Sequence, residues 1–200
     1  DFNHFDWKLD FPEVQNPLVN EKTGFDIVIA NPPYLGDKGN KDKFRPILNT
    51  RLGRSFYKGQ MDLFYFFFHL SFDLLNEKGN TVFITTNYFI TADGAIKLRE
   101  DFFARTNPIS FINFNELRIF ETALGQHNLI THLSKDLQKN RLINISISKS
   151  KQKFDLKYVK RFLDKDLEES EYFEMPKEKL FDGEKKYIRF YNTSNNGIEL

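Results

Sequence analysis

The chain has 200 residues, enough for one domain with a substantial core, and its 23 phenylalanines predict that much of this core is aromatic. It contains no cysteine, which excludes disulfides and thiolate metal sites and fits a reducing, cytoplasmic compartment. The sequence has no run of roughly 18 apolar residues and no signal-peptide pattern, so it gives no support to membrane insertion or secretion.

The charges are unevenly distributed, although they sum to a net charge of only +1. Lysine and arginine dominate from Lys38 to Lys58 and from Lys135 to Arg161, whereas acidic residues dominate from Asp164 to Glu184. Such asymmetry favours a protein with one face turned to a polyanion, and solvated loops and helix faces explain it as well.

The first predicted strand, Ile27 to Ala30, is a β-branched apolar run of the kind found in parallel strands that are buried on both faces. A polar and basic stretch follows it, up to about Gly59. This stretch predicts a long mobile loop with one helical turn at Phe44 to Leu48.

Further elements alternate along the chain. Gln60 to Glu77 predicts a largely buried helix that Lys78-Gly79 terminates, "NTVFITT" a second buried strand, and Ala92 to Thr106 another helix. Three more strands are predicted from "ISFINFNE", "HNLITHLS" and "RLINISIS", and a helix from "QKFDLKYVKRFLDKDLEES". This order indicates a mostly parallel α/β sheet with an antiparallel strand near one edge. The pattern weakens after Lys149, which places a boundary near residue 150.

The tetrapeptide Asn31-Pro32-Pro33-Tyr34 follows the first strand directly, and ligands of open α/β sheets bind at the carboxyl ends of such strands. Prolines fix φ and remove backbone donors, so the turn is a rigid cluster of carbonyl acceptors. The Asn31 side-chain oxygen and the Pro32 carbonyl can accept both hydrogens of a planar exocyclic amine and make it a better nucleophile. Tyr34 offers a ring face for stacking, worth about 1–3 kcal/mol, so the turn points to the amino group of a nucleobase.

The stretch "FDIVIANPPY" resembles the catalytic motif of the amino-group methyltransferases that use S-adenosylmethionine. Residues 62–102 are similar to the helix, strand and helix that follow this motif in adenine-N6 DNA methyltransferases, especially those fused to restriction endonucleases. "NELRIFETALGQHNLI" resembles their later motif, in which a Phe stacks on the flipped adenine, and "FDWKLDFPEV" resembles the stretch before the catalytic motif. The resemblance covers residues 1–150. It implies the methylase part of a fused type II restriction-modification enzyme that acts on double-stranded DNA.

The resemblance also implies three roles for individual residues. Catalysis is assigned to Asn31, Pro32, Pro33 and Tyr34, and base stacking to Tyr34 and Phe120, with Phe114 as the alternative. Contacts with S-adenosylmethionine are assigned to Asp6, Asn31, Asp62, Leu63 and Phe64. A capping role for Asp6 and core packing of Leu63 and Phe64 are ordinary alternatives.

The histidines do not suggest a metal site. His4, His127 and His132 lack metal-ligand spacing. His69 lies inside the Phe-rich helix, where a buried and hydrogen-bonded side chain is expected.

The fold that the resemblance implies is α/β. It is a partial Rossmann-like sheet with the fourth, fifth, seventh and sixth strands of the methyltransferase order, flanking helices and an α+β tail. Residues 1–150 would form the C-terminal half of the catalytic domain, and residues 151–200 a linker or the start of a target-recognition region.

The cofactor loop of that family is missing, since none of the ten glycines forms a Gly-x-Gly pair, and the first residue is Asp1 rather than Met. We therefore expect a piece of a longer chain whose S-adenosylmethionine site is incomplete and which is inactive alone. The strand at Ile27 to Ala30 would then be an exposed sheet edge, through which we expect a homodimer or strand addition.

Other functions remain open at this point. Similar tetrapeptides occur in methyltransferases that act on a protein glutamine or on an rRNA guanine. A non-catalytic role, in which this region only binds DNA or a partner, is the other alternative.

Overall fold

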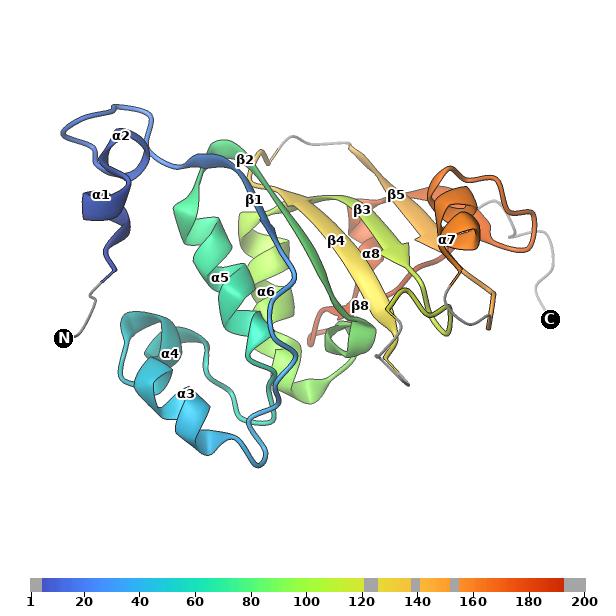
Figure 1. Cartoon of the computed structure of the whole chain (residues 1–200), viewed down its shortest axis with the longest axis horizontal. Coiled ribbons are helices and arrows are strands. Elements are labelled where there is room, and N and C mark those ends of the chain that lie inside the picture. The colour runs from blue at the N-terminus through green and yellow to red at the C-terminus, as the bar shows by residue number, and fades with distance from the viewer. Residues whose placement is uncertain (1–4, 121–125, 138–140, 152–154, 193–200) are drawn as a thin grey trace.

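The computed structural model describes residues 5–120, 126–137, 141–151 and 155–192, whose main feature is a mixed six-stranded sheet (Figure 1). Its strands are β1 (Phe25–Ala30), β2 (Leu75–Thr86), β3 (Asn107–Asn113), β4 (Asn128–Ser134), β5 (Leu142–Ile147) and β6 (Glu171–Pro176). The α-helices are α1 (Trp7–Asp10), α2 (Pro12–Gln15), α3 (Lys41–Leu48), α4 (Arg51–Phe56), α5 (Phe64–Leu74), α6 (Ile96–Arg105), α7 (Leu156–Leu163) and α8 (Lys177–Leu180). Two short 3₁₀ helices, η1 (Asn87–Ile90) and η2 (Asp93–Ala95), and a small hairpin, β7 (Phe181–Asp182) with β8 (Tyr187–Ile188), complete the described elements.

The strand order is β1-β2-β4-β3-β5-β6. The β1–β2 and β3–β5 pairs are parallel, whereas β4 is antiparallel to both β2 and β3. The first four strands in this order are those implied for the fourth, fifth, seventh and sixth strands of a methyltransferase sheet, which confirms the predicted fold class. The antiparallel strand expected near one edge is β4, but it lies inside the sheet between β2 and β3. The edge strand β6, which was not predicted, is antiparallel to β5, so only two of the five strand pairs are parallel and the expectation of a mostly parallel sheet is corrected. No described helix separates β3 from β4, so the chain returns beside β3 in the opposite direction.

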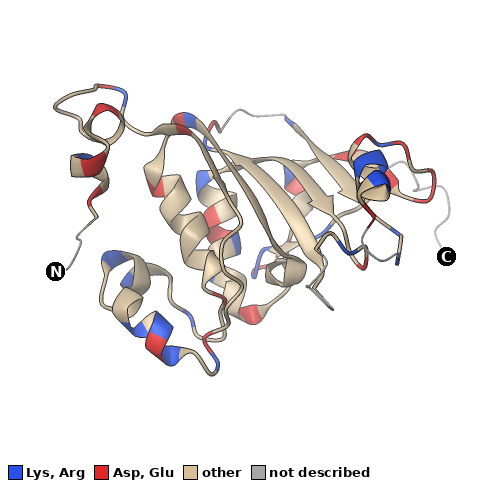
Figure 2. Ribbon diagram, viewed as in Figure 1, with Lys and Arg blue, Asp and Glu red and all other residues tan. Residues whose placement is uncertain are grey.

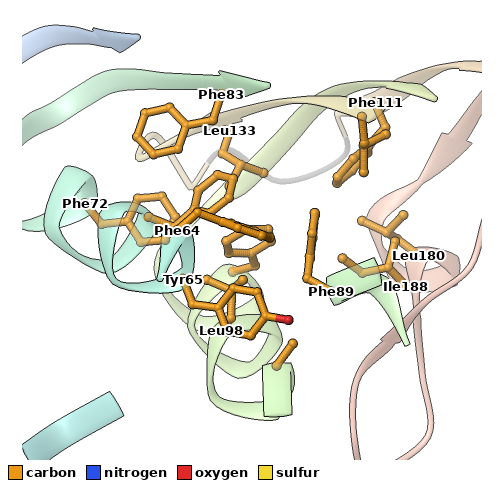
Figure 3. Packing of buried hydrophobic residues seen from close by; sticks show 14 of the residues in the cluster. Phe64, Tyr65, Phe72, Phe83, Phe89, Leu98, Phe111, Leu133, Leu180 and Ile188 are labelled. Atoms are coloured by element: carbon orange, nitrogen blue, oxygen red, sulfur yellow. The ribbon is translucent and has the colours of Figure 1, made fainter. Parts of the chain in front are cut away.

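The core lies between the sheet and the helices α5 and α6, and it is rich in phenylalanine as predicted (Figure 3). Phe64 and Phe72 project from α5, Phe83 from β2 and Phe111 from β3, so aromatic rings meet from three elements. A second, smaller cluster covers the other face of the sheet, where Phe162 of α7 packs edge-on against Phe114 at a ring-centroid distance of 5.4 Å.

Two segments differ from the sequence-based expectation. The stretch expected to be a long mobile loop contains two helices, α3 and α4, because Phe44 is buried and Leu52 packs against the core. The helix expected over residues 60–77 runs only over Phe64–Leu74. Leu75 is already extended and pairs with Phe25, so the last residues of the expected helix belong to β2.

Strand β1 is an edge strand, and only one of its faces is covered. Val28 and Ala30 pack toward the core, but Ile27 and Ile29 are 64% and 76% exposed, which corrects the expectation of burial on both faces. In the described part of the chain, no strand pairs with the outer edge of β1. Trp7 of α1 and Phe11, which lies between α1 and α2, contact the beginning of the strand at Phe25.

The residues beyond 150 extend the same sheet and core. Strand β6 pairs with β5, and Leu180 and Ile188 belong to the main cluster of buried side chains (Figure 3). Arg99 of α6 holds this tail, since its Nε donates to the Lys185 carbonyl at 3.0 Å and its guanidinium lies over the Tyr187 ring. A division of the chain near residue 150 stays a prediction. Among the described residues, no helix is long and apolar enough to cross a membrane.

Candidate active site

The turn Asn31-Pro32-Pro33-Tyr34 leaves the carboxyl end of β1, at the sheet edge where β2 also ends (Figure 1). Asn31 and Pro33 are exposed, Pro32 is buried and Tyr34 is half-buried. The structure therefore presents the amide of Asn31 to the surface on a support that two prolines stiffen.

The hydroxyl of Tyr34 lies between two acceptors. It is 2.9 Å from Asn31 Oδ1 and 3.0 Å from the carbonyl oxygen of Ile84, near the end of β2. A hydroxyl has one hydrogen, so it donates to one of these oxygens at a time. Burial raises the pKa of Tyr34, so its hydroxyl keeps this hydrogen near neutral pH.

Asp62 connects the turn to the start of α5. Its Oδ1 accepts the backbone N–H of Leu35 at 2.7 Å, and its carboxylate also faces the N–H groups of Leu63 and Phe64. Burial raises the pKa of Asp62, and these three N–H groups oppose that shift by favouring the carboxylate. Leu35, which follows the turn, is thus fixed by the side chain of Asp62, 27 positions later in the chain.

Backbone contacts close the same connection. The Leu63 N–H donates to the Leu35 carbonyl at 2.8 Å, and the Asp37 N–H to the Met61 carbonyl at 2.9 Å. Asp37, itself buried, accepts the N–H of Gln60 at 2.9 Å and the hydroxyl of Tyr57 at 3.1 Å. The residues after the turn therefore form a short ladder of backbone hydrogen bonds with residues 61–63 and are not a free loop.

Most of the predicted catalytic and cofactor-binding residues lie together at the turn, but Asp6 lies apart from them. Asn31 to Tyr34 and Asp62 to Phe64 come together, since the Tyr34 ring meets the Phe64 ring edge-on at 6.0 Å. Phe64 is only 1% exposed and Leu63 packs against the core, so both contribute to the packing beneath the turn. Asp6 lies elsewhere: it accepts the N–H of Lys8 at 2.8 Å and caps α1, which packs at the beginning of β1.

The two phenylalanines proposed for base stacking differ in burial. Phe114 is 1% exposed and packs against α7, so its ring is covered on the described structure. Phe120 is half-buried and belongs to neither cluster of buried side chains. Of the two, Phe120 therefore has the ring that a ligand could reach.

His69 is buried and hydrogen-bonded, as expected. Its Nδ1 lies 2.6 Å from Asp101 Oδ2, and Phe56 stacks on its ring. The described residues contain no group of three or more histidine, aspartate or glutamate side chains that could hold a metal ion. His4 lies outside the described residues.

Sequence reasoning missed two features of the site. Asp37 gave no signal, because its partners Tyr57 and Gln60 are about twenty positions away. Asn87, whose Nδ2 donates to Asn113 Oδ1 at 3.2 Å, directly follows the buried strand β2. It carries the same signal that identified Asn31, a polar side chain after a buried strand.

Comparison with known proteins identifies relatives among restriction-modification methyltransferases. The family model of the Eco57I restriction-modification methylase matches residues 1–120. The type II methyltransferases M.HincII and M.HindII of Haemophilus influenzae are each 23% identical over 177 residues, which cover 80% of this chain. These residues make up 35% and 34% of the two relatives, so the chain spans about a third of their length.

Solved structures share the fold. A nuclease-deletion mutant of the type ISP restriction-modification enzyme LlaGI, in complex with a DNA substrate mimic, superposes with a TM-score of 0.58 at 18% identity, covering 86% of this chain and 18% of that one. DrdV in complex with DNA superposes with a TM-score of 0.56 at 15% identity, covering 88% and 19%. At these identities the likeness shows the fold alone.

Proposed function

Because the chain belongs to the Eco57I restriction-modification methylase family, we propose that it carries the base-facing part of a DNA methyltransferase site whose target is the N6 amino group of adenine. The observation that carries this proposal is the turn Asn31 to Tyr34, exposed at the carboxyl end of β1 and fixed by the bond from Leu35 to Asp62. The matched region is only about a third of each relative, so methylation is proposed for the full protein that contains this chain.

The chemistry proposed for the turn is acceptance of the two amine hydrogens. The Asn31 side-chain oxygen and the Pro32 carbonyl take one hydrogen each, which moves the nitrogen toward a geometry with a free lone pair. The target base leaves the duplex to reach them, and its ring stacks on Tyr34 and Phe120. In the structure the Tyr34 hydroxyl lies 2.9 Å from Asn31 Oδ1, so an amine that binds there takes the place of that hydroxyl or uses the second lone pair of the oxygen.

S-adenosylmethionine is the cofactor proposed to supply the methyl group. Asp62, Leu63 and Phe64 lie directly beneath the turn and would border it, but Asp62 already bonds to Leu35 and Phe64 is buried. These residues fit one wall of a cofactor site rather than a complete one. We therefore propose that the chain alone transfers no methyl group. A contact between Asp6 and the cofactor is also proposed, from the resemblance alone, since in the structure Asp6 caps α1.

Two further proposals concern partners and place. The open edge of β1, with Ile27 and Ile29 exposed, is proposed to pair with a second copy or an added strand. Light scattering that gives a strict monomer for the full protein would contradict pairing with a second copy. The cytoplasm is the proposed compartment, as for an enzyme that acts on the cell's own DNA, and fractionation tests it.

The decisive experiment replaces Asn31 with alanine in the full protein. We expect transfer of a tritiated methyl group to duplex DNA to be abolished, while DNA binding is retained because the variant keeps the fold. The matched control is Asn144→Ala, since Asn144 is a half-buried asparagine on β5, several strands away from β1.

The result also separates the alternatives. Methyl transfer by the wild-type protein to rRNA or to a protein glutamine, and not to DNA, would contradict the proposed substrate. Full methylation of DNA by Asn31→Ala would contradict the proposed role of the turn. Methylation at the cytosine amino group would leave the turn's role intact and contradict adenine as the target.

A further inference from the structure

We propose that residues 38–58, the basic hairpin formed by α3 and α4, are a surface that contacts the phosphates of duplex DNA beside the flipped base. This inference rests on the proposed function, because it assigns the partner of that same site. Figure 2 shows the concentration of lysine and arginine on these two helices.

The charge of the basic hairpin is strongly one-sided. Its 21 residues contain seven basic side chains and a single acidic one, Asp42. All seven are exposed: Lys38, Lys41, Lys43, Arg45, Arg51, Arg54 and Lys58. A net charge of +6 contrasts with +1 for the whole chain, so the rest of the molecule is acidic on balance.

Most of these cations lack a carboxylate partner. In the described structure only Lys43 and Arg51 form ion pairs, with Asp42 at 3.8 Å and with Asp73 at 3.7 Å. Exposed pairs of this kind contribute about 0–1 kcal/mol, so they leave the cations available to another anion. A repeating polyanion is the partner that such a surface fits.

The basic hairpin is packed onto the protein by its apolar side. Phe44 of α3 is buried against Phe66 of α5, with ring centroids 6.2 Å apart. Gly53 lets α4 approach α3 closely, because an added Cβ would lie 2.1 Å from the Ile47 carbonyl oxygen. The apolar side of the hairpin is packed against the protein, so the two helices that carry the exposed cations are held in place.

Both ends of the basic hairpin are attached next to the turn. Its start follows Asp37, which bonds to Met61, and Lys97 of α6 donates to the carbonyls of Ser55 at 2.7 Å and Tyr57 at 3.3 Å. The basic hairpin therefore begins and ends beside the proposed base-facing residues. Phosphates that flank an extruded base would lie where such a surface can reach them, and contacts with phosphates orient a duplex without choosing its sequence.

The test measures how DNA affinity depends on salt. The variant Lys38→Gln, Lys41→Gln, Arg45→Gln removes three exposed cations that have no described carboxylate partner. Each lost phosphate contact is expected to reduce the slope of log affinity against log salt by about 0.9, so three contacts reduce it by about 2.7. Between about 50 and 200 mM salt, the wild-type protein then loses about 40-fold more affinity than the variant.

The control removes three exposed lysines elsewhere. Lys8→Gln, Lys22→Gln, Lys78→Gln acts on α1 and on the amino ends of β1 and β2, away from the turn, and is expected to keep the wild-type slope. A second variant, Lys38→Arg, Lys41→Arg, Arg45→Lys, keeps the charge and should also keep the slope. Circular dichroism confirms that each variant is folded before its affinity is measured.

An unchanged slope in the folded hairpin variant, or an equal change in the control, overturns the proposal. Affinity is measured with the full protein and without S-adenosylmethionine, so a loss of DNA binding is distinguished from a loss of methylation. A wild-type protein that binds duplex DNA but transfers no methyl group to it contradicts the proposed function and not the surface. Methyl transfer to DNA together with an unchanged slope contradicts the surface alone.

Discussion

Replacing Asp62 with alanine is expected to lower the free energy of unfolding by about 1–4 kcal/mol. The bond from the Leu35 N–H to Asp62 Oδ1 is 2.7 Å long and partly buried. Losing its acceptor leaves that N–H unsatisfied, at a cost of about 1–3 kcal/mol. The carboxylate also faces the N–H groups of Leu63 and Phe64 at the start of α5, which adds about 0.3–1 kcal/mol.

Urea denaturation, followed by circular dichroism, measures this loss directly. Asp62→Asn keeps one oxygen acceptor and is expected to lose about half as much or less. Asp42→Ala is the control, because this exposed carboxylate has only a 3.8 Å ion pair and should change stability by less than about 0.5 kcal/mol. A loss below about 1 kcal/mol for Asp62→Ala would refute the conclusion that this carboxylate holds the turn.

Kinetics of the full protein then separate positioning by Asp62 from contact with the cofactor. If Asp62 positions the turn, kcat of methyl transfer falls and KM for S-adenosylmethionine is unchanged. A rise in that KM with little change in kcat would support the cofactor contact that the sequence predicted.

Two other substitutions test the support of the site. Gly94→Ala should destabilise the protein by about 1–3 kcal/mol or more, because its Cβ would lie 1.9 Å from the Gln60 carbonyl oxygen, whereas Gly36→Ala, with no atom within 4 Å, should be nearly neutral in thermal denaturation. Burial lowers the pKa of His69, so the unfolded chain binds a proton that the folded one does not, and stability should fall by up to about 1.4 kcal/mol per unit as pH drops below about 6.5. His69→Gln should remove that part of the slope, and an unchanged pH profile of urea denaturation would show that His69 does not titrate.

The local parts of this molecule were predictable from sequence, and the long-range contacts were not. The strand β1 and the turn after it carry their own signal, because a β-branched apolar run that ends in Asn31 and two prolines has few other conformations. The strands β4 and β5 appear within about a residue of their predicted limits, since alternation of apolar and polar residues is visible in a short window.

The predicted helical turn at Phe44 to Leu48 is the last part of α3. The start of α3 and the whole of α4 were missed because their apolar residues are few and are separated by Pro46 and Gly53, residues that usually interrupt helices. They form because Phe44 finds a place against α5, and no local pattern shows that contact. The support of the turn is also long-range: Tyr34 meets Ile84 across 50 positions and Leu35 meets Asp62 across 27. A single sequence shows the residues that form these hydrogen bonds, but it does not show which of them pair.

The hydroxyl of Tyr34 also bears on selectivity. In the structure the hydroxyl lies 2.9 Å from the amide oxygen of Asn31, so a ligand that takes the hydroxyl's place there exchanges one bond for another and gains little from that bond alone. A ligand without a donor would leave the Asn31 oxygen unpaired whenever it displaced the hydroxyl. The tyrosine can fall back on the Ile84 carbonyl at 3.0 Å, so the exchange leaves neither partner unsatisfied when the newcomer is an amine. Under the proposed role, the turn would therefore favour incoming groups that can donate a hydrogen bond.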